Sequence, residues 1–386
     1  MRKLLAKTDK WLFILMIVYM ILGLIMIFSS SSVSTVLRYN VSPYHFFVRQ
    51  LVFLIASFFI GFFIILKIPT SKYRYFTSFM ILTIIVLLAG LFLYGKITNG
   101  AQGWYDLKFF SLQPSEFAKS VIVLFMAVFY NRLAKKKVNS VGLYFIPLAI
   151  AALIIVLVLG QPDFGGAVIL ACIAFGIFIS VPIIKNNAAK VVKLLVVGVI
   201  ILALGLVYSG SEILNSAQLR RFTFKDPCQR YTENTGYQVC NGFIAIHNGG
   251  LWGVGLGNST QKYLYLPESH TDFIFPIIVE ELGLVISIII ILGYVFMLYR
   301  ILKIAKEADN LRCSILAYGT FIYIAVHLLI NLLGVLAIIP LTGVPVPLLS
   351  YGGSYTINVV IMLFVVQRVA IENKTNKTKK EIENIK

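Results

Sequence analysis

Ionisable side chains that could act on a substrate gather just before a long apolar run. The stretch 265–272 contains Glu268, His270 and Asp272, and the apolar run begins at the next residue. Charge at the edge of a membrane span is costly unless it is paired or used. Two carboxylates and a histidine at the boundary between water and lipid therefore indicate that the chemistry of the protein takes place there. The structural alternative is a helix cap, because Ser269-x-x-Asp272 resembles a capping box.

A second pair of opposite charges lies in the sequence Gln113-Pro-Ser-Glu-Phe-Ala-Lys119. Pro114 suits the first position of a helix, and Glu116 then falls in the first turn, where the helix dipole favours an anion. Lys119 follows three residues later on the same face, so the two can pair. One interpretation is a cap with a neutralising lysine. The other is functional, since Lys119 lies more than a turn inside an apolar span.

Four further candidates for substrate binding lie in the external loops or beside them, and three of the four have a structural alternative. Arg49 can anchor a span by reaching the lipid headgroups, Trp104 can belong to an aromatic belt, and Asp163 can cap a helix. Ser350 lies in the segment 339–354, whose prolines and glycines exclude a continuous helix. Irregular backbone at membrane depth must be buried in protein or line a cavity, so we expect this segment to line a cavity.

The elements that position these residues are membrane spans. Hydrophobic residues make up 59% of the 386-residue chain and charged residues only 13%, with a mean hydropathy of +0.88. Apolar runs of about 20 residues are typical of transmembrane helices. The pattern predicts an all-α polytopic membrane protein with ten transmembrane helices, at about 11–30, 48–67, 76–95, 115–132, 141–160, 165–184, 193–210, 273–299, 313–334 and 354–371.

The placement of charge predicts the orientation. The chain has a formal net charge of +18, but most of its 34 basic residues fall in loops on the side of the N-terminus. The positive-inside rule makes that side cytoplasmic, so the charge reflects topology and not nucleic-acid binding. Both termini are then cytoplasmic, and one large external loop, about 211–272, joins helices seven and eight. We expect one membrane domain, 1–371, and a disordered cytoplasmic tail, 372–386.

Two cysteines share the large external loop. Cys228 and Cys240 would be exposed to an oxidising environment, where a disulfide can form. The sequence leaves open whether they are bridged.

Four motifs, taken together, resemble the SEDS family (shape, elongation, division and sporulation) of polytopic peptidoglycan glycosyltransferases. The resemblance covers essentially all the predicted spans. The motifs stand in family order: Gln113-Pro-Ser-Glu-Phe-Ala-Lys119, Gln161-Pro-Asp-Phe-Gly165, Tyr265-Leu-Pro-Glu-Ser-His-Thr-Asp-Phe-Ile-Phe275 and Pro345-Val-Pro-Leu-Leu-Ser-Tyr-Gly-Gly353.

The resemblance implies a substrate and roles for several residues. The substrate is lipid II, an undecaprenyl-pyrophosphate disaccharide-pentapeptide presented at the outer face of the bacterial cytoplasmic membrane. Asp272 matches the family's catalytic carboxylate and would activate the 4-hydroxyl of the acceptor sugar. Glu116 and Lys119 match a functional pair, and Arg49 matches an arginine at the second span. Lys119 and Arg49 would hold the pyrophosphate.

Under the same resemblance, Glu268 and His270 position Asp272 and tune its pKa. A divalent cation, Mg²⁺ or Mn²⁺, could bridge the phosphate and a carboxylate, with Asp272 or Glu116 as its protein ligand. No organic cofactor is implied.

The chain departs from the family pattern at two places. Gly103 stands where many members have a basic residue before the tryptophan, and Tyr355 stands where members often have a second serine. The amino-acid sequence of residues 257–267 resembles the cell-division branch of the family more than its elongation branch. Either branch implies a class B penicillin-binding protein as partner, alongside other membrane proteins of the division or elongation machinery.

Two other functions compete with the enzyme. A flippase for the lipid-linked precursor would also have many spans, buried charge and a broken segment. It needs a polar path across the bilayer, however, whereas Glu116, Asp163, Asp272 and Ser350 are predicted at one face. A non-catalytic scaffold of the division machinery would tolerate replacement of Asp272.

Overall fold

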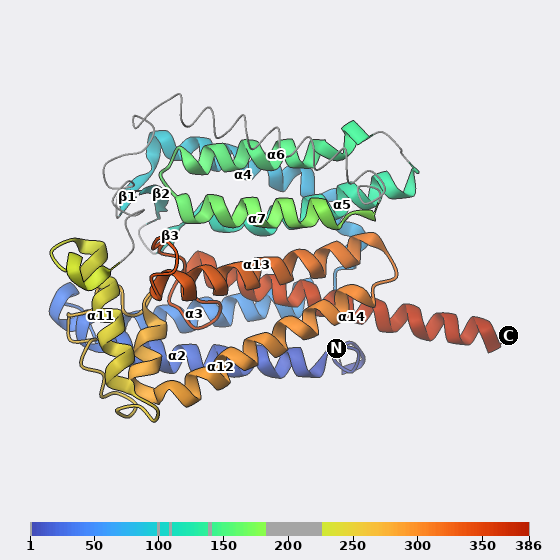
Figure 1. Cartoon of the computed structure of the whole chain (residues 1–386). Coiled ribbons are helices and arrows are strands. Elements are labelled where there is room, and N and C mark those ends of the chain that lie inside the picture. Colours follow the sequence, from blue (N-terminus) through green and yellow to red (C-terminus); the bar gives the residue numbers. More distant parts are fainter. Residues whose placement is uncertain (1, 99–100, 108–109, 138–140, 183–225, 386) are drawn as a thin grey trace.

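The structure is a bundle of long helices with its two termini at one end (Figure 1). It is a computed structural model that describes residues 2–98, 101–107, 110–137, 141–182 and 226–385.

Eight of the described helices are long and apolar enough to cross a membrane. A ninth, α7 (Phe164–Ser180), is also apolar but shorter. The predicted span 193–210 lies outside the described residues, so the count of ten stays a prediction. The eight helices comprise α2 (Lys10–Tyr39), α3 (His45–Ile60) with its π-helical extension Gly61–Ile65, α4 (Thr77–Tyr94), α5 (Pro114–Lys135), α6 (Val141–Leu159), α12 (Ile274–Lys306), α13 (Leu311–Val335) and α14 (Gly353–Ile385).

Shorter elements flank the bundle. A short helix, α1 (Arg2–Leu5), precedes α2, and a 3₁₀ helix spans Thr70–Tyr75. At the end opposite the termini, α11 (Asn234–Gly249) lies across the bundle (Figure 1). The predicted large external loop is therefore partly helical in its described portion. A 3₁₀ turn, Pro227–Arg230, precedes α11, and the disulfide between Cys228 and Cys240 joins the two.

The expectation of an all-α fold needs one correction. Three short antiparallel strands, β1 (Lys96–Thr98), β2 (Ala101–Asp106) and β3 (Ser111–Leu112), precede α5 in the order β1-β2-β3. An ion pair of 2.9 Å between Lys96 and Asp106 ties β1 to the end of β2. The strands place the start of α5 close to α14, because the hydroxyl of Ser354 accepts a hydrogen bond from the backbone of Gln113.

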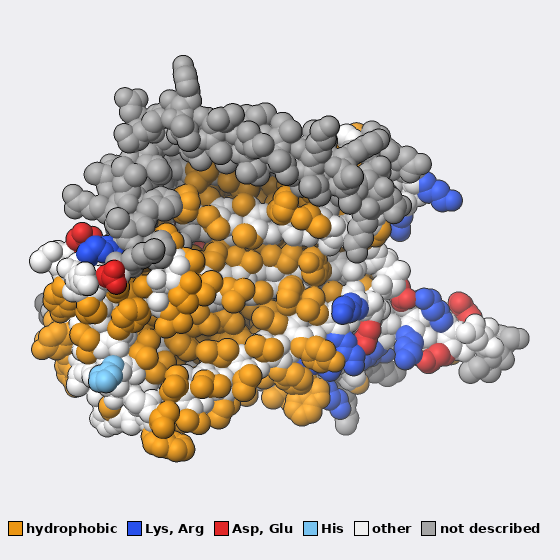
Figure 2. Space-filling model, viewed as in Figure 1, with side chains coloured by type: hydrophobic (Ala, Val, Ile, Leu, Met, Phe, Trp, Pro, Cys, Tyr) orange, Lys and Arg blue, Asp and Glu red, His pale blue; other side chains and the backbone are white. Residues whose placement is uncertain are grey.

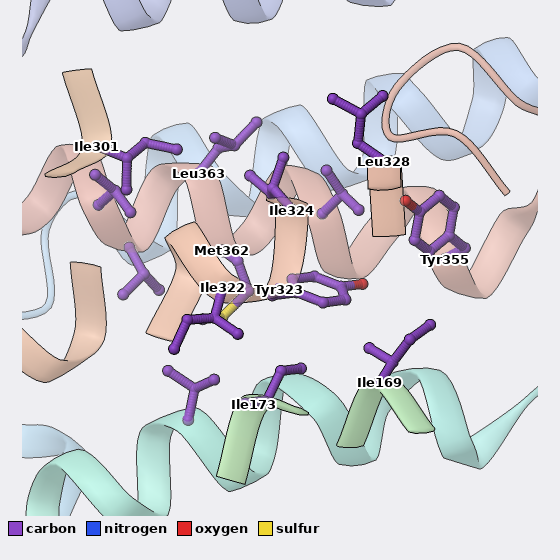
Figure 3. Packing of buried hydrophobic residues seen from close by; sticks show 14 of the residues in the cluster. Ile169, Ile173, Ile301, Ile322, Tyr323, Ile324, Leu328, Tyr355, Met362 and Leu363 are labelled. Carbon is purple, nitrogen blue, oxygen red and sulfur yellow. The ribbon is translucent and has the colours of Figure 1, made fainter. Parts of the chain in front are cut away.

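The innermost helices are α13 and α14, with 72% and 78% of their most apolar segments buried. Figure 3 shows part of this core, where Tyr323 of α13 and Tyr355 of α14 lie among aliphatic side chains. Hydrophobic side chains cover the flank of the bundle, while Lys and Arg gather at the end that carries the termini (Figure 2). This distribution fits the predicted cytoplasmic side.

The C-terminal tail differs from the expected disorder, because α14 continues to Ile385. Several polar contacts hold the first part of the tail in place. Asn373 donates to the carbonyl of Ile304, Lys374 donates to the carbonyl of Thr8, and Lys380 pairs with Asp309 at 2.6 Å. These partners come from distant parts of the chain, which the composition of the tail does not reveal.

Helix α12 is broken at Gly283, which has a φ of 83°. Residues other than glycine rarely adopt this conformation. The backbone on either side of the break bonds with the segment 250–255. The carbonyls of Glu280 and Glu281 accept from Val254 and Gly255, at 2.9 and 3.0 Å. In return, Leu284 and Val285 donate to the carbonyls of Gly250 and Leu251. Backbone groups freed by the break are thus satisfied, as burial demands.

The side chains of Glu280 and Glu281 are fully buried, and both are partnered, as their depth predicts. Glu281 pairs with Lys262 at 3.0 Å and accepts from Ser29 of α2 at 2.7 Å. Within the described part of the chain, Glu280 accepts only from neutral donors, which come from Asn248 and from residues 259–261. This buried network fixes the segment 257–262 on α12.

We expect Gly283→Ala to lower the stability of the protein more than Gly250→Ala. Both glycines have positive φ, so each substitution incurs backbone strain of about 1–3 kcal/mol. Only at Gly283 would the added methyl overlap other backbone, that of Trp252 and Gly253. Thermal unfolding in detergent measures the difference. Equal unfolding temperatures for the two variants would contradict the close packing of Gly283 against the backbone of Trp252 and Gly253.

Candidate functional site

Asp272 lies at the junction of the external segment with α12, where three parts of the chain meet. Its backbone carbonyl accepts a hydrogen bond of 2.7 Å from the Asn331 amide of α13. Its Oδ2 faces Gly343 of the segment 336–352, and its side chain is almost buried. The N-cap of α12 is Phe273, without a side-chain hydrogen bond, so the structure does not bear out the capping alternative for Asp272.

A second carboxylate lies close to Asp272. The hydroxyl of Thr271 is 3.0 Å from Asp272 Oδ1 and 3.1 Å from Glu268 Oε2. A single hydroxyl proton can serve only one acceptor at a time. Thr271 can therefore donate to only one of the two carboxylates at a time, and the carbonyl of Glu268, at 3.1 Å, is a third acceptor for the same proton. Glu268 is thus placed where its charge acts on Asp272.

His270 forms an aromatic support between α3 and the segment 336–352. Its ring lies 4.4 Å from that of Phe46 and 5.7 Å from that of Tyr351, and its carbonyl accepts from the Tyr351 N–H at 2.9 Å. Burial, with a smaller contribution from the positive charge of Arg38, lowers the pKa of His270 to about 4. The imidazole is therefore neutral at physiological pH.

Arg49 is an exposed cation beside this support. Burial raises the pKa of the Tyr351 hydroxyl, and the charge of Arg49 and its hydrogen bond to that hydroxyl partly offset the rise. Arg49 thus stands at the edge of the segment 336–352, which faces Asp272. Arg38, at the end of α2, is a second exposed cation near His270, and we did not predict it.

Glu116 and Lys119 form the predicted pair, with 2.7 Å between Lys119 Nζ and Glu116 Oε1. The ammonium group also lies 3.2 Å from Nε2 of His327 on α13. Glu116 is thus engaged by a side chain as well as placed in the first helical turn. The Lys119 side chain is only 1% exposed, so the pair is enclosed between helices in this conformation.

Asp163 and Ser350 are both engaged within the fold. Asp163 caps α7 by accepting from Gly166 N–H at 2.8 Å, and it also accepts from Ser115 of α5 at 3.0 Å. The Ser350 hydroxyl oxygen accepts from Val346 N–H at 2.8 Å, which closes the turn around it. For Asp163 the capping alternative is what the structure shows.

Trp104 lies opposite Lys96 in the β1–β2 pair, half-buried. Its strands lie at the same end of the bundle as α11, opposite the termini (Figure 1). The site candidates that the sequence predicted at one face thus come from the same end of the helices, as their positions at the beginnings of α5, α7, α12 and α14 require.

The described residues supply only some of the ligands that a divalent cation needs. Among the residues that the structure describes, no group of three or more His, Cys, Asp or Glu side chains could hold a metal. Mg²⁺ is commonly held by one or two carboxylates together with substrate phosphates and water. Asp272, with Glu268 near it, fits that pattern, whereas Glu116 already pairs with Lys119.

Sequence reasoning missed His327 and Asn331. Both are polar residues in an otherwise apolar stretch of α13, four positions apart and therefore on one face of the helix. Their position inside a span was the available signal.

Known proteins match the chain along nearly its whole length. The FtsW/RodA/SpoVE family, described as "Cell cycle protein", matches residues 9–375. The "Probable peptidoglycan glycosyltransferase FtsW" of Bacillus subtilis (strain 168) is 36% identical over 394 residues, covering 99% of this chain and 95% of the relative. Stage V sporulation protein E of the same organism is 33% identical over 362 residues, covering 90% and 93%.

Solved structures share the fold. A chain from a peptidoglycan synthase complex aligns with a TM-score of 0.72 at 22% identity, covering 95% of this chain and 98% of the other. The rod shape determining protein RodA of Thermus thermophilus aligns with a TM-score of 0.65 at 23% identity, covering 94% and 96%.

We expect acid to destabilise the protein partly through His270. Its folded-state pKa of about 4 lies below the usual 6.5, so the unfolded chain binds a proton that the folded chain does not. Stability then falls as the pH drops from about 6.5 towards 4, by roughly 1.4 kcal/mol per pH unit. Thermal unfolding of the wild type and of His270→Phe across this range should show a shallower fall for the variant. His247→Gln, on the exposed face of α11, should behave as the wild type. Parallel curves for all three proteins would contradict the assignment.

We expect Lys119→Met to reduce stability by about 3–5 kcal/mol, because it leaves a buried carboxylate without its partner. The double variant Lys119→Met/Glu116→Gln removes the charge as well, so it should recover much of the loss. Unfolding in detergent tests both. A single variant as stable as the wild type, or a double variant no better than the single, would show that the pair is not the stabilising unit.

Proposed function

Because the chain belongs to the FtsW/RodA/SpoVE family, we propose that it is a peptidoglycan glycosyltransferase that polymerises lipid II into glycan strands. The resemblance to the SEDS family is thus confirmed at the level of the family. The chain is a multi-pass membrane protein, and we place it in the bacterial cytoplasmic membrane, with the reaction at the outer face. The names of its relatives favour septal synthesis during cell division.

The observation that carries the proposal is the position of Asp272. Its backbone is fixed by Asn331, its side chain faces the glycine of an irregular segment, and it is not the cap of the helix it precedes. A carboxylate held in this way is suited to take a proton from a hydroxyl placed against it.

The reaction follows from these groups. The acceptor's 4-hydroxyl oxygen attacks the anomeric carbon of the donor while its proton passes to Asp272. The bond from that carbon to the pyrophosphate breaks, and the electron pair leaves with the undecaprenyl pyrophosphate. Inversion results from a single displacement. The leaving group becomes more negative, so it requires positive charge nearby.

Arg49 is the predicted pyrophosphate ligand that is exposed at this end. Lys119 is enclosed by Glu116 and His327, which supports a role in placing the start of α5. A divalent cation bound by the pyrophosphate and Asp272 would add further charge neutralisation.

A partner that crosslinks the new strand completes the proposal. One structural neighbour comes from a peptidoglycan synthase complex that coordinates polymerisation and crosslinking. We propose a class B penicillin-binding protein as the corresponding partner of this chain, with other division proteins around it.

We expect Asp272→Asn to lose about 10²–10⁴-fold in the rate of glycan synthesis, because it keeps the size of the side chain and removes the base. The assay follows polymer formed from labelled lipid II by the chain purified with its penicillin-binding protein. Asp226→Asn is the matched control, since it makes the same change at an exposed position of the external segment and should retain activity.

The two rival functions give different outcomes in this assay. A flippase would produce no polymer from either protein but would move labelled lipid II across vesicle membranes. If the protein were a scaffold, the wild type and Asp272→Asn would give equal amounts of polymer, or neither would give any. Undiminished polymer from Asp272→Asn would overturn the assignment of the base.

A further inference from the structure

A stripe of buried polar side chains on α13 connects the two charged parts of the site. Tyr323, His327 and Asn331 follow one another at intervals of four, so they share one face of the helix. All three are buried inside the bundle. Polar side chains within a span need partners, and the partners of His327 and Asn331 belong to the site.

Asn331 joins the backbone at Asp272 to the segment 336–352. Its Nδ2 has two hydrogens, and it lies 2.7 Å from the carbonyl of Asp272 and 2.7 Å from the carbonyl of Val344. Gly343, next to Val344, faces the Asp272 carboxylate. One amide thus fixes the distance between the proposed base and the irregular segment beside it.

His327 connects Lys119 to the same irregular segment. An ammonium group can only donate hydrogen bonds, so Nε2 of His327 must be the acceptor of its 3.2 Å contact with Lys119. The ring proton is then on Nδ1, which lies beside the backbone of Pro345 in poor hydrogen-bond geometry.

Aromatic contacts hold the His327 ring in this orientation. The ring of Tyr355 is stacked on it, with 4.7 Å between centroids and 26° between planes. Tyr323 meets it edge-on at 4.9 Å. Figure 3 shows both tyrosines in the packed layer of the core. Their hydroxyls make no hydrogen bond among the described residues, so their contribution here is the ring.

We propose that His327 and Asn331 are positioning residues for the glycosyl transfer, with His327 placing the Lys119–Glu116 pair and Asn331 placing Asp272. The segment 336–352 lacks a continuous helix, so a few hydrogen bonds decide where it lies. Loss of the Asn331 amide leaves two buried carbonyls without that donor, which favours a shift of the backbone. A shift of about 1 Å at reacting groups can reduce the rate about 100-fold.

This inference rests on the proposed function, so it is tested in the same lipid II assay with the same complex. Asn331→Leu is expected to lower kcat about 100-fold while KM changes less than about threefold, because placement of the base matters in the transition state. Asn331→Ser keeps one hydrogen-bond donor, so its kcat should fall roughly tenfold. This variant tests the role of Asn331 if Asn331→Leu does not fold.

His327 is tested by rescue. His327→Leu removes the acceptor and should lower kcat at least about tenfold, whereas His327→Gln supplies an amide oxygen and should remain within about threefold of the wild type. Tyr355→Phe keeps the stacked ring and should leave the rate unchanged. Thr320→Val is the control on α13, because among the described residues its hydroxyl bonds only to the carbonyl of Leu316 in its own helix.

The outcomes separate this inference from the proposed function. Polymer from the wild type that is lost in Asp272→Asn supports the function; if Asn331→Leu and His327→Leu then retain the wild-type kcat, the positioning roles are overturned. They are also overturned if His327→Gln fails as completely as His327→Leu, or if Thr320→Val loses as much. Absence of polymer from the wild type would instead overturn the function on which both roles depend.

Discussion

The interruption of α12 at Gly283 is the constraint on which much of this structure depends. A broken helix at the membrane boundary leaves backbone donors and acceptors that water cannot easily reach, so they must find partners in the protein. The segment 250–255 supplies those partners, and the carboxylates of Glu280 and Glu281 hold the next segment, 257–262. The external chain is thereby led back to the start of α12, where Asp272 lies.

Asp272 therefore owes its position to several elements. The backbone pairing of the segment 250–255 with α12 fixes the helix that follows it, Asn331 fixes its backbone carbonyl, and Gly343 of the segment 336–352 faces its carboxylate. Irregular backbone is tolerated here because these neighbours satisfy its polar groups. Catalytic geometry built from irregular segments depends on such support, since loops lack the internal bonds that fix a helix.

The sequence alone predicted the features that depend on local signals. The start of α12 after Asp272 and the pairing of Glu116 with Lys119 follow from residue type and position. The sequence offered the cap at Asp163 and the bridge between Cys228 and Cys240 without deciding either, and the structure contains both. Contacts between distant residues were not predictable in this way. Lys119 was expected at the substrate, but His327, far away in the chain, encloses it. The helical tail likewise depends on partners such as Thr8 and Ile304.

The order of the buried network along the chain has a consequence for how the protein is made. Lys262 and the donors at 259–261 precede α12, so they are synthesised before the two glutamates that need them. When α12 enters the bilayer, the groups that neutralise or solvate Glu280 and Glu281 are already present on the preceding segment. Membrane insertion of a helix with two adjacent acids is thereby assisted by its own upstream sequence.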